Sequence, residues 1–335
     1  MRHISNASPR NPHVRRKPGK RRRSPIFTLA ILLGIALPLL GIYFIAGGSQ
    51  YEITNGSHTN MQSTVTCDNN EPNPQAETYQ YRQLQAYDAT QTCTQADVLI
   101  LTFDQLTEIS NDHLLLINID NPVPSYISGN LARVSDYVRA LNPETLLDGY
   151  VLARLRTMFD SAVNVGFTQF RVTQGFRTHE YQQNLFDTAP DQSLVAPPGH
   201  SEHQVGLAVD ISYEGVNIGN SAQGTWLMEN SYRYGFILRY PQHKTHITNV
   251  PFEPWHYRYV GQPHAYFMTG NDLVLEEYID LLRAAGELTV IFNGTTYRVY
   301  YLSGPDESIE IQEGYAFWAS RDNTGGIIVT MYRLS

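Results

Sequence analysis

Three side chains that could bind a metal ion lie close together in the segment PGHSEHQVGLAVDI, residues 198–211. His200 and His203 come first, and Asp210 follows within the apolar run LAVDI. That run favours a buried strand, where a carboxylate is costly unless it is paired or bound to a metal. The residue types therefore indicate a metal site or an ion pair at Asp210.

A second segment, EPWHYRYV at residues 253–260, adds His256 and Glu253. Two histidines and one aspartate leave a fourth position for water, which is the arrangement of catalytic zinc sites. Zinc lowers the pKa of its bound water, and a nearby carboxylate can then accept and pass on a proton. Glu253 suits that role if the strand begins after Pro254 and a bend turns the carboxylate back toward the metal.

The spacing alone leaves a second interpretation open, in which each histidine is an ordinary core or surface residue. The helical zinc-protease motif HExxH does not occur, because His179 and Glu180 are followed by Tyr-Gln-Gln. Any zinc site must therefore be assembled from loops and strands rather than from one helix.

The elements that must position these side chains follow from hydrophobic periodicity. Apolar residues recur at helical spacing over residues 148–165 and predict a core helix. Further helices are predicted over 179–186, 226–234 and 272–285. Strands are predicted over 113–121, 170–173, 207–211 and 255–260, with a strand and short helix over 99–109.

The last 50 residues have a different character. Residues 289–301 form two β-rich runs around Asn293-Gly294, a strong hairpin signal, and residues 327–332 alternate apolar and polar residues. The sequence therefore predicts an α+β domain over 110–285, followed by a small β module over 286–335.

The N-terminal residues combine positive charge with a long apolar run. Residues 1–25 hold nine Lys or Arg and no Asp or Glu, and residues 26–46 follow without a charge. At 1.5 Å rise per residue this run spans about 30 Å, the thickness of the hydrocarbon core of a bilayer. We therefore expect a basic cytoplasmic segment, a transmembrane anchor over 26–46 and an extracellular remainder in the cell membrane. A cleaved signal peptide is the alternative, with the same placement of the rest.

Residues 47–95 are rich in Asn, Gln, Thr and Ser, and we expect an extracellular spacer over residues 47–109. Cys67 and Cys93 are expected to pair in that compartment, the alternative being two free thiols. Beyond residue 25 the chain of 335 residues carries 15 basic and 32 acidic residues, which disfavours a nucleic-acid partner.

The two metal-binding segments together resemble the VanY-type D-alanyl-D-alanine carboxypeptidases. That family belongs to the LAS group of metallopeptidases, which also includes lysostaphin-like enzymes and the hedgehog signalling domain. The resemblance covers residues 110–283, and its motifs in chain order are GFRTHEYQ, SxHxxGLAxD, WLMENSYRYGF, RYP and ExWHYRYVG. It implies an α+β fold in which a small antiparallel central sheet is flanked by helices.

The resemblance also implies roles for individual residues. It implies that zinc is held by three side chains: His203, Asp210 and His256. Glu253 would be the catalytic base, and His200 would lie near the mouth of the site without binding the metal. Arg177 matches an arginine that binds substrate or the anionic tetrahedral intermediate, and Gln182 and Ser201 match positions that line the peptide site.

The implied function is a zinc carboxypeptidase that removes the terminal D-Ala from the pentapeptide stems of peptidoglycan. Such trimming removes the vancomycin target, so glycopeptide resistance and housekeeping roles are both compatible with the sequence. An L,D-carboxypeptidase or a peptidoglycan endopeptidase with the same zinc site stays open, as does a metal-holding binding module, which would not need Glu253. The β module could bind wall polymer, cover an edge of the catalytic domain or mediate dimerisation.

Overall fold

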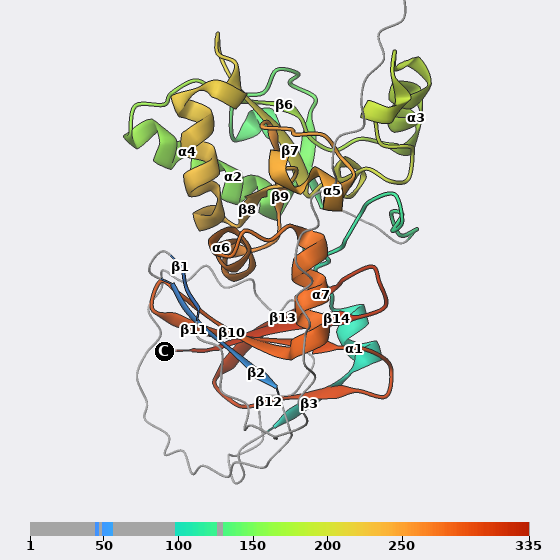
Figure 1. Ribbon diagram of the computed structural model, residues 1–335, viewed down its shortest axis with the longest axis vertical. Helices are drawn as coiled ribbons and strands as arrows, with labels where there is room; N and C mark the ends of the chain where they lie inside the picture. Colours follow the sequence, from blue (N-terminus) through green and yellow to red (C-terminus); the bar gives the residue numbers. More distant parts are fainter. Residues whose placement is uncertain (1–43, 47–48, 56–97, 126–129, 335) are drawn as a thin grey trace, which may run out of the picture. The chain divides into compact units, whose positions relative to one another are not determined.

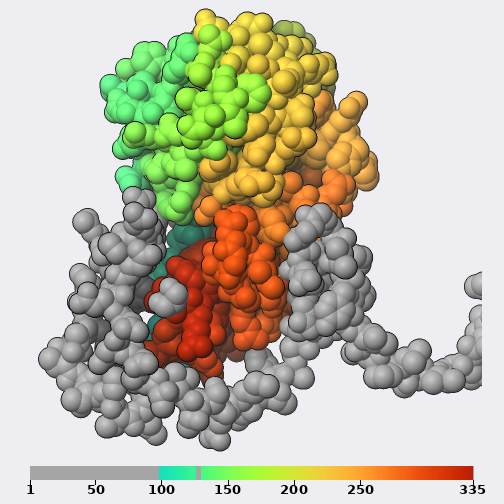
Figure 2. Space-filling model, turned by 90° about the vertical axis from the view of Figure 1, so that its left-hand side faces the viewer, coloured from blue at the N-terminus to red at the C-terminus, as the bar shows by residue number. Residues whose placement is uncertain are grey.

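The structure is a computed structural model that describes residues 44–46, 49–55, 98–125 and 130–334. Within these residues the fold is α+β, with a four-stranded and a six-stranded sheet and two short strand pairs (Figure 1). We call residues 110–270 the central domain and residues 275–333 the C-terminal module. In Figure 2 the green and yellow part of the central domain borders orange and red surface that includes the module.

The central domain is built on the four-stranded sheet, whose strand order is β6-β7-β9-β8 and whose neighbours are all antiparallel. Its strands are β6 (Phe170–Gln174), β7 (Ala208–Tyr213), β8 (Phe236–Leu238) and β9 (His256–Tyr259). A short pair at its side is formed by β4 (Leu131–Arg133) and β5 (Leu146–Asp148). The sheet agrees with the expected small antiparallel centre.

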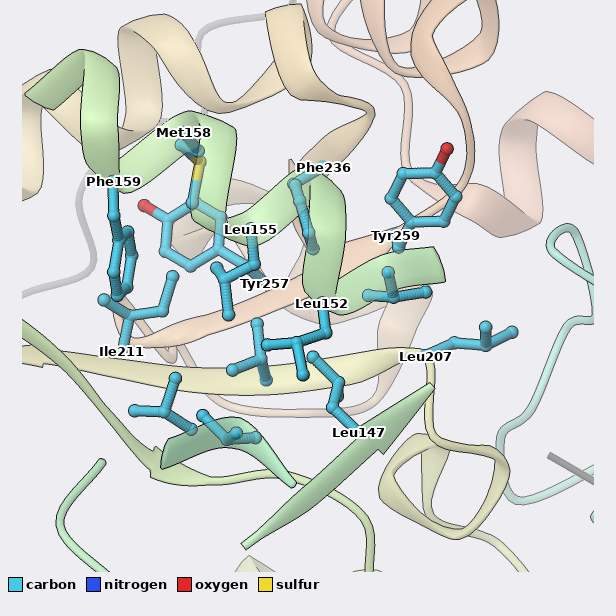
Figure 3. Close-up of a cluster of buried hydrophobic side chains, with 14 of the residues drawn as sticks. Leu147, Leu152, Leu155, Met158, Phe159, Leu207, Ile211, Phe236, Tyr257 and Tyr259 are labelled. Atoms are coloured by element: carbon cyan, nitrogen blue, oxygen red, sulfur yellow. The ribbon is translucent and has the colours of Figure 1, made fainter. Parts of the chain in front are cut away.

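Helix α2 (Gly149–Asn164) packs its apolar side on this sheet and confirms the helix predicted over 148–165. It begins at Asp148, whose carboxylate accepts hydrogen bonds from the N–H groups of Tyr150 and Val151. Figure 3 shows Leu152 and Leu155 of this helix among side chains from the sheet. This core is the rigid base on which the strands are held.

The other helices of the central domain surround the sheet. They are α3 (His179–Thr188), α4 (Ala222–Asn230), α5 (Thr245–Thr248) and α6 (Gln262–Gly270). Short 3-10 helices connect them: η1 (Val134–Asp136), η2 (Gln192–Leu194), η3 (Glu202–Val205), η4 (Ile218–Asn220), η5 (Ser231–Tyr234) and η6 (Gln242–Lys244). The predicted helix over 226–234 is therefore split between α4 and η5.

The C-terminal module consists of helix α7 (Leu275–Ala285) and the strands that follow it. The strands are β10 (Gly286–Phe292), β11 (Thr295–Leu302), β12 (Ser308–Ile311), β13 (Tyr315–Arg321) and β14 (Ile327–Arg333). With β1 (Phe44–Ala46) and β2 (Ser49–Asn55), all of these strands except β12 form a sheet of order β1-β2-β10-β11-β14-β13. The predicted hairpin is confirmed, since Asn293 and Gly294 both have positive φ between β10 and β11.

Apolar side chains join the module to the central domain. One buried cluster contains Leu114 and Val260 of the central domain together with Leu282 and Val290 of the module. Residues 99–108 also belong to this region, because β3 (Leu99–Thr102) pairs with β12 and leads into α1 (Phe103–Glu108). The strand and short helix expected there are confirmed.

The strand predicted over residues 113–121 is wrong, because this segment forms turns and irregular backbone. Its backbone groups bind other partners: the carbonyls of His113 and Leu115 accept hydrogen bonds from Arg258, and the N–H of Leu116 donates to the carbonyl of Asp322. Most of the apolar residues of the segment are buried, as their hydrophobicity predicts. Their backbone groups, however, form hydrogen bonds with residues far away in the sequence instead of with a neighbouring strand.

The transmembrane helix expected over residues 26–46 is not supported by the structure. In the part of it that the structure describes, residues 44–46 are strand β1, paired with β2. No helix within the described residues is long and apolar enough to cross a membrane. A run of apolar residues does not by itself distinguish a helix from a strand. Residues 26–43 and both cysteines, Cys67 and Cys93, lie outside the described residues.

Candidate metal centre and active site

Two of the expected ligands meet because their strands are neighbours. Strand β7 pairs with β9 so that Asp210 lies directly opposite His256. Side chains at directly opposite positions of an antiparallel pair lie on the same face of the sheet. The Asp210 Oδ1 atom is 3.2 Å from His256 Nδ1.

The third expected ligand, His203, reaches the same place from the short helix η3. Gly206 ends that helix with φ of 71°, a left-handed conformation that glycine adopts readily, and the chain then enters β7. The Nδ1 atom of His203 lies 2.8 Å from the carbonyl oxygen of Gly175, and its Nε2 atom lies 3.4 Å from Asp210 Oδ1. The first contact orients the ring so that Nε2 faces Asp210.

These three side chains form a group that can hold a metal ion. One donor atom from each of His203, Asp210 and His256 lies within 4.8 Å of the other two, and all three residues are buried. Asp210 Oδ1 is buried and has no hydrogen-bond partner among the described residues. A buried carboxylate oxygen left without a donor between two imidazole nitrogens fits a cation that all three would share.

Glu253 lies beside this group because the chain turns immediately before β9. The N–H of Glu253 donates to the carbonyl of Tyr240, and the N–H of His256 donates to the carbonyl of Glu253. This turn is the bend expected at Pro254, and it places Glu253 Oε2 3.4 Å from His256 Nδ1. The carboxylate side chain keeps 23% of its surface exposed, so it remains accessible to solvent.

Arg177 also lies beside the metal-binding group. Its Nη2 atom is 3.5 Å from Asp210 Oδ2, and its backbone N–H donates to the carbonyl of His203. Its Nη1 atom donates to Gln182 Oε1 over 3.3 Å, while Gln182 Nε2 donates to the carbonyl of Ala196. The Nε atom of Arg177 is buried with no partner in the part of the chain that the structure describes. Arg177 is thus held in place with one donor available.

The remaining two candidates differ in their surroundings. Ser201 is buried at the residue that precedes η3, two positions before His203. His200 is not part of the metal-binding group, and its Nδ1 atom lies 2.9 Å from the carbonyl oxygen of Asn118.

A buried carboxylate behind His256, that of Glu202, was not predicted from the sequence. Glu202 Oε2 lies 3.3 Å from His256 Nε2, and Glu202 Oε1 accepts hydrogen bonds of 2.8 Å from Arg239 Nε and Arg258 Nη1. Glu202 and both arginine side chains are fully buried. A glutamate next to a histidine in a polar motif is usually interpreted as a surface residue. The sequence signal for a buried carboxylate was Arg258, because an arginine within the aromatic strand HYRY needs a negatively charged partner.

The electrostatics of the site favour positive charge. Burial alone would lower the pKa of His256, but the neighbouring carboxylates of Asp210 and Glu202 raise its pKa to about 9. Burial would likewise raise the pKa of Asp210, but His203 and His256 hold it well below its usual range. In contrast, burial raises the pKa of Glu253, which leaves it the more basic of the two carboxyl groups that face the site.

Residues 144–262 match the family model described as VanY, D-alanyl-D-alanine carboxypeptidase. A D-alanyl-D-alanine carboxypeptidase from Enterococcus faecium is 32% identical over 233 residues, which cover 67% of this chain and 77% of that protein. Another from Enterococcus faecalis (strain ATCC 700802 / V583) is 39% identical over 183 residues, covering 50% of this chain and 65% of that protein.

Among solved structures, the chain is similar to the vancomycin resistance D,D-dipeptidase VanXYg in complex with a D-Ala-D-Ala phosphinate analogue. The TM-score is 0.62 at 26% sequence identity, and the superposition covers 72% of this chain and 100% of that one. The similarity therefore extends over more of the chain than the 119 residues from 144 to 262 that match the family model.

Proposed function

Since this chain belongs to the VanY-type D-alanyl-D-alanine carboxypeptidases, we propose that it is a zinc enzyme that removes the terminal D-Ala from peptidoglycan stem pentapeptides. The observation that carries the proposal is the unpartnered Asp210 Oδ1, held between the imidazole nitrogens of His203 and His256 with Glu253 beside them. A role in glycopeptide resistance would follow from the same reaction, because it removes the terminus that glycopeptides bind.

Zinc is the metal that the donor set favours. Two imidazole nitrogens and one carboxylate oxygen make a three-ligand site of the kind that catalytic zinc occupies with one position open. Bound by His203, Asp210 and His256, zinc would supply a Lewis acid that polarises the scissile carbonyl and activates water.

Glu253 would move the proton. A general base must reach the attacking water and must ionise near the working pH, and burial raises the pKa of Glu253 in that direction. The carboxylate would take a proton from the attacking water and deliver it to the leaving amino group of D-Ala. The turn at Glu253–His256 holds the backbone of Glu253, and its Oε2 atom lies 3.4 Å from His256 Nδ1, beside the metal-binding group.

Arg177 would bind negative charge. The guanidinium donates to Gln182, while the backbone N–H of Arg177 donates to the carbonyl of His203. The guanidinium stays protonated although burial lowers its pKa. Its unpartnered Nε–H can donate to the carboxylate of the terminal D-Ala or to the oxyanion that develops during hydrolysis.

The test uses the purified full-length chain loaded with zinc. It is incubated separately with pentapeptide and tetrapeptide stems, with and without a chelator, and the products are identified by mass spectrometry. We expect loss of one D-Ala from the pentapeptide, abolished by the chelator. Cleavage of the tetrapeptide alone would move the enzyme to the L,D class, and no cleavage of either stem would overturn the carboxypeptidase assignment.

Two variants of Arg177 separate charge from geometry. Arg177→Lys keeps a cation but loses the planar fork and the Nε–H donor, so we expect it to bind zinc normally and to lose much of the turnover. Arg177→Ala should lose more. Full turnover by the alanine variant would show that Arg177 has no part in the reaction.

A further inference from the structure

We propose that Glu202 is a positioning residue that holds the ring of His256 for metal binding, and that the C-terminal module keeps Glu202 in place through Arg239 and Arg258. The inference rests on the proposed metal site. The C-terminal module would then help to form the metal site.

The first step is the contact between Glu202 and His256. The Nδ1 atom of His256 faces Asp210 Oδ1 at 3.2 Å, so the metal would be bound through Nδ1. The proton of a neutral ring must then sit on Nε2, which lies 3.3 Å from Glu202 Oε2. A carboxylate that accepts this proton fixes both the tautomer and the orientation of a metal-binding histidine, and raises its basicity.

Glu202 is itself held in place by two arginines. Its other oxygen, Oε1, accepts from Arg239 Nε and Arg258 Nη1 over 2.8 Å each. Glu202 and the side chains of both arginines are inaccessible to solvent. Two guanidinium groups on one oxygen leave Oε2 free for His256, and burial leaves the carboxylate no water to turn toward.

Arg239 connects this carboxylate to helix α7. Its Nη1 and Nη2 atoms donate to Glu276 Oε2 and Oε1 over 2.9 and 2.7 Å. Glu276 lies in the first turn of α7, the helix of the C-terminal module that packs on β10 and β11. Arg239 therefore forms two ion pairs, one with Glu276 of the module and one with Glu202.

Arg258 makes a second connection through the turns that follow α1. Its Nη2 atom donates to the carbonyls of His113 and Leu115 over 3.1 and 2.8 Å. The intervening Leu114 N–H donates to Ser320 Oγ of β13 over 2.8 Å. Both arginines that hold Glu202 are therefore braced by the module, directly for Arg239 and through one segment for Arg258.

The alternative is that Glu202 is only a neutralising partner for two buried arginines. That role would affect the stability of the fold but not the metal. The two interpretations differ in what a change at Glu276 on α7 does to the metal site. Within the described residues, the hydrogen bonds of the Glu276 carboxylate come from Asn118 and Arg239, and none joins it to a metal-binding side chain or to Glu202.

The experiment compares the full-length chain with Glu202→Gln, Glu276→Gln and Glu277→Gln. Glu277 is the matched control, since it lies next to Glu276 on α7 but pairs with Lys244. Zinc affinity is measured by competition with a chromophoric chelator, and the cobalt-substituted proteins are compared by their visible absorption spectra. Unfolding of each metal-free variant is followed in parallel, and neither metal readout requires turnover of a peptide.

We expect Glu202→Gln to bind zinc about 10- to 100-fold more weakly and to shift the cobalt spectrum. Glu276→Gln should weaken zinc several-fold in the same direction, and Glu277→Gln should match the wild type. If Glu202→Gln does not fold, Glu276→Gln decides. Unchanged zinc affinity and cobalt spectrum in a folded Glu202→Gln would overturn the positioning role, and an effect of Glu202→Gln without one of Glu276→Gln would overturn the part of the module. Zinc bound by a wild type that cleaves no stem peptide would refute the proposed function alone.

Discussion

The substitution Gly175→Ala tests how closely the backbone is fitted around the metal site. A Cβ atom added at Gly175 would lie 2.3 Å from the carbonyl oxygen of Leu146, well inside the closest approach that such atoms normally make. The obstacle is backbone, and that oxygen already accepts a hydrogen bond from the N–H of Phe176. The residue can be accommodated only if the chain after β6 moves away.

The size of the effect has two parts. Overpacking against a fixed neighbour costs about 1–3 kcal/mol of the free energy of unfolding. The carbonyl of Gly175 also accepts from Nδ1 of His203 at 2.8 Å, so a shift of this backbone releases the ring of a metal ligand. Loss of such a contact lowers metal affinity by about 10- to 100-fold, equivalent to about 1.4–2.7 kcal/mol.

The assay measures both parts separately. Urea unfolding of the metal-free proteins gives the stability, and competition with a chelator gives the zinc affinity. The control is Gly304→Ala, because an added Cβ there meets nothing within 4 Å, and we expect it to lie within about 0.5 kcal/mol of the wild type. A Gly175→Ala protein with wild-type stability and wild-type zinc affinity would refute the reasoning.

Three further predictions concern the base and the buried rings. Glu253→Gln should bind zinc as the wild type does and lose turnover by about 100-fold or more, and retained turnover would exclude it as the base. Tyr257→Phe should raise the free energy of unfolding by about 1 kcal/mol, because the buried Tyr257 hydroxyl has no partner within the described residues. Tyr278→Phe should lower the free energy of unfolding by a similar amount, because it removes the hydrogen bond between the Tyr278 hydroxyl and His264. Burial lowers the pKa of His264 to about 3, so only the unfolded chain gains this proton as the pH falls below about 6.5. Between pH 6 and pH 5 the wild type should therefore lose about 1 kcal/mol more stability than His264→Gln, and equal losses would contradict the shift.

Local features of the fold were predictable because they depend on residues that are close in sequence. The spacing of apolar residues over 148–165 defines one face of a helix, and Asn293-Gly294 supplies the positive φ that a tight hairpin requires. The need of Asp210 for a partner was predictable for the same reason. A carboxylate in an apolar run becomes buried, and burial without a partner is unfavourable in any fold.

The wrong predictions were those in which an apolar segment was assigned to a helix or a strand from its hydrophobicity. The segment 113–121 is buried in part but forms no strand, because Arg258 and the β13–β14 hairpin take its backbone hydrogen bonds. Residues 44–46 end an uncharged run that also suits a membrane helix, yet they pair as a strand with β2. Hydrophobicity predicts that a segment leaves water, and the partner that satisfies its backbone determines its shape.

The side chains able to bind a metal and move a proton were recognisable from the chain alone, because those properties belong to the residue types of His203, Asp210, His256 and Glu253. The pairing of β7 with β9 in the register that sets Asp210 against His256 became known from the folded structure. It alone shows Glu202 buried behind that ring, since the arginines that make its burial possible lie 37 and 56 residues farther along the chain. A charge can leave water only where opposite charges meet it, and that meeting depends on long-range packing rather than on local sequence.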